Sequence, residues 1–186
     1  MNARWELPER AIIGGRQYEI HTDYRDILEI FSCFSNPDWS DFIKWEVALA
    51  LFYEGQIPDA HRLQAMEYLS WFIAGGQREP QPSGPKLIDW EQDAQLIVSD
   101  INKTAGQEIR ALPFVHWWTF LSWFHAIGEG QLSTVVAIRS KLAHGKKLDS
   151  GEKEFYSRNR SLVDFRKRYS PGEMEEKLRL EKLLGR

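Results

Sequence analysis

The sequence predicts a mainly α-helical protein, a single helical domain of about six to eight helices with a short N-terminal β-hairpin. Apolar residues recur at helical spacing over most of the chain after residue 20. A strand pattern occurs only near the N-terminus, around a Gly-Gly pair. With 186 residues, the chain can bury a sizeable core without disulfides, which fits its single cysteine, Cys33.

The expected hairpin lies within the first 20 residues. Two β-prone runs, residues 11–13 and 16–20, flank Gly14-Gly15. A Gly-Gly loop is typical of a hairpin because type I′ turns need positive φ at both central positions. An isolated hairpin is only marginally stable, so we expect it to pack on the helical body.

Capping and breaking residues divide the first half into three helices. The expected spans are 23–35, with Asp23 as cap, then 38 or 40 to 53, and 58–74, starting at Pro58-Asp59. The second helix is apolar on nearly all sides, which indicates either a central element or a partner surface. Residues 75–86, rich in Gly and Pro, are expected to form a long loop.

In the second half, Asp89 is expected to cap a fourth helix that ends near Lys103. Pro113 should open the fifth, which runs through the aromatic stretch 114–127 and is apolar on most sides. Such a helix belongs in the core, either wholly or with one side against a partner. The remaining expected helices span 131 or 133 to 143, 150–169 and 173–184.

The charges divide the chain into two segments. Residues 146–186 carry 12 Lys and Arg against 8 Asp and Glu, a net charge of +4, and residues 1–145 carry −7. We therefore expect an acidic helical body, 1–145, and a basic, charged C-terminal helical tail, 146–186. The net charge of −3 makes a nucleic-acid binder unlikely, although aromatic residues among the basic residues of the tail keep that alternative open.

No catalytic or metal motif is evident. The five histidines include no close ligand pair, and Cys33 has no neighbouring base or cation that would activate it. Asp89, Glu91 and Asp93 suit a helix N-terminus, whose dipole they complement, better than acid–base work. We expect no enzyme activity, cofactor or metal. No apolar run is long enough for a membrane span and no signal peptide is apparent, which predicts a cytoplasmic protein.

Four segments taken together resemble a family of small proteins encoded in tailed phages and prophages of Gram-positive bacteria, which is named by a gene-product number. These segments are residues 20–25, 88–94, 115–121 and 138–141, the last followed by a charged helical tail. The run His116-Trp117-Trp118 after an acid-capped helix is the most specific element. The resemblance extends from about Glu9 to Leu184.

The resemblance implies a role in tail morphogenesis as a tail assembly chaperone, which coats the tape measure protein in the cytoplasm of the bacterial host before the tail tube polymerises around it. Other chaperone subunits or tail tube subunits are further implied partners, and a homo-oligomer is an open possibility. The expected partner-binding residues, with Trp45, Trp117 and Trp118 at an aromatic centre, are Trp45, Asp89, Trp90, His116, Trp117, Trp118 and Arg139. Two alternatives remain open: a structural virion component, such as a head–tail completion or tail accessory protein, and a nucleic-acid-binding regulator.

Overall fold

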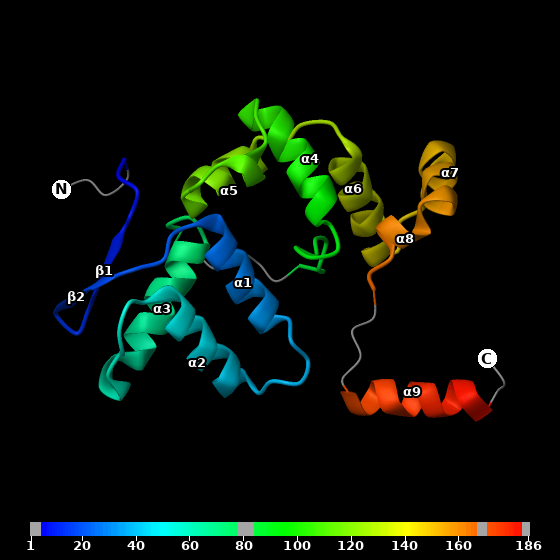
Figure 1. The fold of residues 1–186 in the computed structure, drawn as a ribbon. Coiled ribbons are helices and arrows are strands. Elements are labelled where there is room, and N and C mark those ends of the chain that lie inside the picture. The colour runs from blue at the N-terminus through cyan, green and yellow to red at the C-terminus, as the bar shows by residue number, and fades with distance from the viewer. Residues whose placement is uncertain (1–4, 78–83, 167–170, 184–186) are drawn as a thin grey trace.

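The computed structural model describes residues 5–77, 84–166 and 171–183 (Figure 1). Within them the protein is mainly α-helical and has one two-stranded antiparallel hairpin, as the sequence predicts. The elements are β1 (Arg10–Ile13), β2 (Arg16–Glu19), α1 (Tyr24–Phe34), α2 (Asp41–Phe52), α3 (Arg62–Ile73), α4 (Ala94–Ala105), α5 (Trp117–His125), α6 (Gln131–Ala143), α7 (Ser150–Arg158), α8 (Arg160–Val163) and α9 (Pro171–Leu183), with short 3-10 turns at Asp59–His61 and Ile109–Ala111. No helix in these ranges is long and apolar enough to cross a bilayer.

The hairpin packs on the helical body, as expected. Gly14 and Gly15 both have positive φ, 57° and 78°, which the tight turn between β1 and β2 requires. The Tyr68 hydroxyl of α3 donates to the carbonyl of Arg10 at 2.9 Å. The Gly14 N–H donates to the side chain of Gln64, also on α3, at 2.8 Å. Both ends of β1 are therefore tied to one helix.

The first three helices form most of the N-terminal core. Asp23 caps α1 by accepting the Arg25 N–H at 2.9 Å, and Ser40 caps α2. The third helix is preceded by a 3-10 turn at 59–61, so its regular α-helical part begins later than predicted, at Arg62. Phe52 of α2 and Phe72 of α3 are both fully buried, with ring centroids 5.0 Å apart.

The fourth helix begins at Ala94, so the prediction that Asp89 caps it is wrong. The Asp89 carboxylate instead accepts the N–H groups of Glu91 (3.1 Å) and Gln92 (2.9 Å), which closes a turn ahead of the helix. The N-cap residue is Asp93, and its side chain does not cap α4 because it is bonded to Arg139.

The predicted start of the fifth helix at Pro113 is also wrong, because the segment that follows is extended. The Val115 N–H donates to the Asp23 carboxylate at 3.0 Å, and the Val115 carbonyl accepts the Tyr24 N–H at 2.9 Å. The Trp117 N–H donates to Thr22 at 2.7 Å. The Val115 carbonyl and the Trp117 N–H are groups that a first helical turn from Pro113 would use, so α5 begins at Trp117.

The predicted seventh helix, 150–169, is broken in two. Helix α7 ends at Arg158, and Asn159 has non-helical backbone angles (φ −126°, ψ 34°) before the short helix α8. Residues 167–170 lie outside the described residues. Helices α6 and α8 share a second small core with the segment before α7, formed by Val135, Ile138, Leu148 and Val163. Helix α9 stands apart from the body (Figure 1).

Candidate partner-binding surfaces

Trp117 is a core residue that joins three helices. Its side chain is 1% exposed, and its indole N–H donates to the Ile73 carbonyl at the end of α3 at 2.9 Å. The ring stacks on Phe120 with centroids 5.4 Å apart and lies 5.9 Å from Phe31 of α1. This residue therefore holds α5 against α1 and α3 and offers no free surface.

Trp118 is half-buried and closes the end of α3. Its indole N–H donates to the Phe72 carbonyl at 2.9 Å, and its ring meets Trp71 edge to face at 5.4 Å. Gly76, which comes shortly after the end of α3, has φ +83°, and a Cβ atom on it would lie only 2.9 Å from the Trp118 ring. The close approach of backbone and indole therefore depends on glycine.

His116 has a defined structural role at the start of α5. Its Nδ1 accepts the Trp118 N–H at 3.0 Å, so it caps the helix, and its Nε2 lies 3.2 Å from the Pro8 carbonyl. A neutral ring with its proton on Nε2 satisfies both contacts. Burial lowers the pKa of His116, which favours that neutral form.

Trp90 and Trp45 are half-buried at separate places. The Trp90 ring packs between Phe31 (5.5 Å) and Phe124 (5.1 Å). The Trp45 ring meets Phe34 edge to face at 4.9 Å. In the described parts of the chain, Trp45 has no ring contact with Trp117 or with Trp118, so the three do not form the expected common aromatic centre.

Arg139 and Asp93 form a buried ion pair between α6 and the start of α4. The guanidinium binds both Asp93 oxygens, at 2.6 and 2.9 Å, and the two side chains are 3% and 0% exposed. Asp89 joins this network because its N–H donates to Asp93 at 2.9 Å. Asp89 and Arg139, two of the predicted site residues, are thus connected through Asp93.

The same guanidinium also holds the C-terminal segment. Its Nε–H donates to the Val163 carbonyl and its Nη2 to the Leu162 carbonyl, both at 2.7 Å, and Nη1 donates to Leu87 at 2.9 Å. The Phe165 ring lies over it at 4.1 Å. Arg139 therefore links α4, α6, α8 and the segment that precedes Asp89, which is an architectural role.

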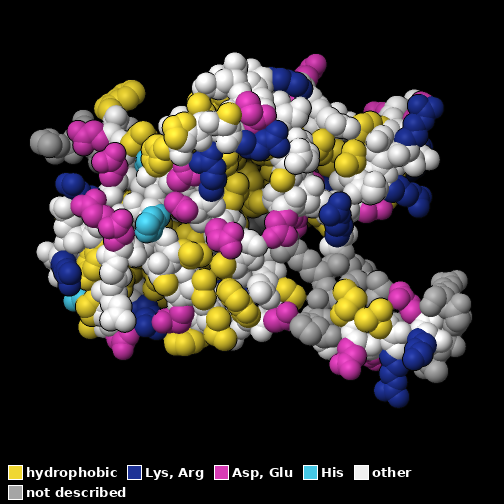
Figure 2. Space-filling view, in the orientation of Figure 1, with side chains coloured by type: hydrophobic (Ala, Val, Ile, Leu, Met, Phe, Trp, Pro, Cys, Tyr) yellow, Lys and Arg dark blue, Asp and Glu magenta, His cyan; other side chains and the backbone are white. Residues whose placement is uncertain are grey.

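The most exposed apolar side chains on the helical body lie instead on α2 and α3. Phe42 and Leu63 are 67% and 68% exposed, and Ile43 is 44% exposed. We call these three residues the α2–α3 apolar surface. Figure 2 shows hydrophobic side chains gathered over the part of the body where Figure 1 places these helices. The Arg62 guanidinium lies 5.7 Å from the centre of the Phe42 ring, so the two helices meet within this surface.

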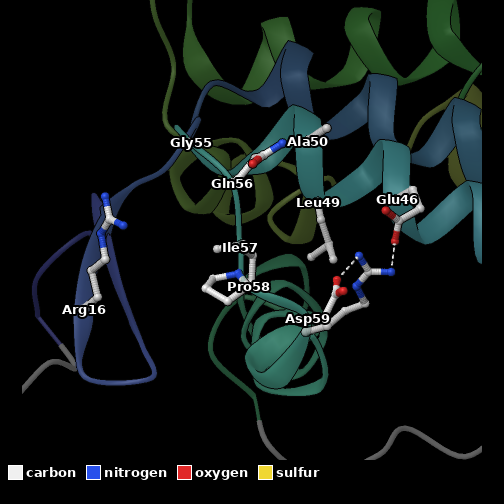
Figure 3. Close-up of a pocket in the computed structure, with 10 residues that line it drawn as sticks. Arg16, Glu46, Leu49, Ala50, Gly55, Gln56, Ile57, Pro58 and Asp59 are labelled. Atoms are coloured by element: carbon white, nitrogen blue, oxygen red, sulfur yellow. Dashed lines mark hydrogen bonds and ion pairs between the residues drawn. The ribbon is translucent and has the colours of Figure 1, made fainter.

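A groove of about 650 Å³ opens beside this surface (Figure 3). Leu49, Ile57 and Pro58 line its middle, and Arg16 of the hairpin stands across from them. On the other wall, Arg62 forms ion pairs with Glu46 and Asp59. Sequence reasoning missed this groove because its walls come from segments between residues 16 and 62 that only the fold brings together.

Burial shifts the pKa values of two further side chains that pack in or against the core. Burial raises the pKa of Tyr68 to about 12 and also raises the pKa of the Cys33 thiol. Both shifts favour the neutral side chain. Among residues 5–77, 84–166 and 171–183, no cluster of three or more His, Cys, Asp or Glu side chains is arranged to hold a metal ion.

This helical body with an N-terminal hairpin matches a known family. The model of the bacteriophage Gp15 protein family matches residues 6–165, and the chain therefore belongs to this bacteriophage protein family. The match covers every element from β1 to α8 but not α9, whereas the sequence resemblance was expected to extend to Leu184. Searches of curated proteins and of solved structures gave no match.

Proposed function

We propose that this protein is a tail assembly chaperone-like protein that binds the tape measure protein during phage tail assembly in the cytoplasm of a Gram-positive host. Membership of a bacteriophage family supports a role in phage morphogenesis. A tape measure is a long apolar helical chain that needs protection from aggregation until the tube encloses it. A protector needs an apolar surface that remains accessible in its own folded state.

The observation that carries this proposal is the α2–α3 apolar surface. The first turn of α2 exposes Phe42 and Ile43, and the first turn of α3, where Arg62 lies over the Phe42 ring, exposes Leu63, although α2 also buries Ala48, Leu49 and Phe52 in the core. An amphipathic helix can pack its apolar face on neighbouring apolar side chains of this kind. Trp117 supports the surface indirectly, since its indole N–H is bonded to the Ile73 carbonyl at the end of α3.

Co-expression with the tape measure protein of the same phage tests the proposal. A soluble complex is expected, with the tape measure insoluble when expressed alone. Phe42→Ser and Ile43→Ser should each raise the dissociation constant of the complex about tenfold, which corresponds to ~1.4 kcal/mol of lost binding, and should thereby lower its recovery. The matched control is Leu142→Ser on α6, which also removes an exposed apolar side chain (41% exposed) but away from this surface.

The alternative is a structural virion component, which the same family membership allows. A chaperone leaves before the particle is complete, whereas a head–tail completion or tail accessory protein remains in it. Mass spectrometry of purified virions distinguishes them. A stable protein that ignores the tape measure and copurifies with virions would replace the chaperone proposal with the structural one.

A further inference from the structure

The segment before β1 exposes a tryptophan. The Trp5 side chain is 90% exposed and that of Leu7 is 49% exposed, with the exposed acidic residue Glu6 between them. In the described part of the chain, no cation pairs with Glu6. Tryptophan is enriched at interface centres because it buries a large area at a small cost in conformational freedom. We call residues 5–7 the N-terminal arm.

The groove of Figure 3 has complementary chemistry. Ile57 and Pro58 supply an apolar floor, and the Arg16 side chain stands on the hairpin wall. Among the described residues no carboxylate pairs with Arg16, whose guanidinium lies 5.1 Å from the Tyr18 ring centre. On the opposite wall Arg62 is already neutralised by Glu46 and Asp59. The groove therefore suits an apolar segment that carries one acidic residue.

We propose that the N-terminal arm of one copy binds in this groove of a second copy. Trp5 and Leu7 contact the floor, and Glu6 pairs with Arg16. A groove of about 650 Å³ is within the range that binds a drug-sized ligand, so it has room for these side chains. The arm leaves the hairpin at the end opposite to the turn beside Arg16 (Figure 1).

Reciprocal exchange of arms closes a two-fold dimer, because each copy offers one arm and one groove. Each arm buries only two large side chains, so the contact falls below the ~1,200–2,000 Å² of a standard stable interface. We therefore expect a dissociation constant on the order of micromolar rather than nanomolar. This contact is independent of the tape measure.

Sedimentation equilibrium of the full chain, at concentrations on either side of the expected micromolar constant, tests the proposal. Trp5→Ala should raise the dissociation constant at least ~30-fold, as loss of an interface anchor does. The matched control is Phe114→Ala, which removes an exposed aromatic side chain (56% exposed) outside the groove and should leave the dimer unchanged. Since Trp5 is almost fully exposed, its replacement should not alter the thermal unfolding of the monomer.

A charge exchange identifies the groove as the binding site. Glu6→Arg and Arg16→Glu should each weaken the dimer. The double variant should have a dissociation constant at least about tenfold lower than either single variant, since the exchanged charges again attract. A chain that is monomeric at every concentration tested would overturn the proposal. A dimer that withstands Trp5→Ala, or that gains nothing from the double variant, would also overturn it and would point to the α2–α3 apolar surface or to α9. Tape measure binding by the Phe42→Ser variant is a separate readout, so either proposal can fail alone.

Discussion

Removal of the Arg139 guanidinium should destabilise the protein more than any surface substitution. Arg139→Met retains an unbranched apolar stem but deletes every donor, which leaves Asp93 charged and 0% exposed without its counterion. Three backbone carbonyls, those of Leu87, Leu162 and Val163, lose their donor at the same time. Loss of one partner of a buried ion pair costs about 3–5 kcal/mol, a large share of the ~5–15 kcal/mol that holds a typical domain folded.

Thermal and urea unfolding measure this effect. For a chain of this size the loss corresponds to a fall in Tm of about 6–20 °C. Arg139→Lys should recover only part of it, because an ammonium group cannot bind both Asp93 oxygens and the carbonyls of α8 in one plane. The double variant Arg139→Met with Asp93→Leu should be more stable than Arg139→Met alone, since it removes the uncompensated charge.

The matched control is Arg158→Met on α7, where the ion pair with Glu154 is exposed and worth at most ~1 kcal/mol. A loss below ~1 kcal/mol for Arg139→Met, or a double variant no better than the single one, would refute the argument that this pair is a buried tie between α4, α6 and α8.

Three further predictions concern the junction of α1, α3 and α5. Because the pKa of His116 is lower in the folded protein, the unfolded chain binds a proton at a higher pH than the folded one does. The free energy of unfolding should therefore fall as the pH drops below ~6.5. His116→Asn, which keeps a capping oxygen, should reduce this pH dependence in a series of urea melts. Gly76→Ala should lower the free energy of unfolding by about 1–3 kcal/mol in the same assay, because it adds a Cβ against Trp118 and forces a non-glycine residue to φ +83°. An unchanged urea midpoint would contradict this packing. Asp23→Ala should lower the free energy of unfolding by about 1–3 kcal/mol, because it removes the α1 cap and the acceptor of the Val115 N–H. Asp23→Asn should retain most of that stability if hydrogen bonding rather than charge is responsible.

Local signals in the sequence determined the elements themselves. The Gly14-Gly15 turn and the Asp23 cap were predicted, and Ser40 and Gln131 were each one of two predicted helix starts, because each depends on residues within a few positions of one another. The mainly helical class follows from the same local periodicity.

Long-range pairing decided what the sequence did not reveal. The fifth helix starts at Trp117 rather than Pro113 because residues 22–24, some 90 positions earlier, occupy the intervening backbone groups. The fourth starts at Ala94, after the turn that the Asp89 carboxylate closes, and the Asp93 side chain at its N-cap position is bonded to Arg139, 46 residues later, rather than to the helix. A propensity scan sees neither partner, so both boundaries were misplaced.

The candidate surfaces divide in the same way. The sequence singled out Trp117 and Trp118 by residue type, and the family resemblance singled out His116 and Arg139, but only the tertiary structure decided that their polar groups are bonded within the body. The sequence also indicated a second helix that is apolar on nearly all sides and is either a central element or a partner surface. Which of its residues stay exposed depends on how α1 and α3 pack against it, and the groove beside them exists only because the hairpin folds back onto α3. Chain-local chemistry determined the helices and their caps, whereas burial and exposure arose from contacts between segments distant in sequence.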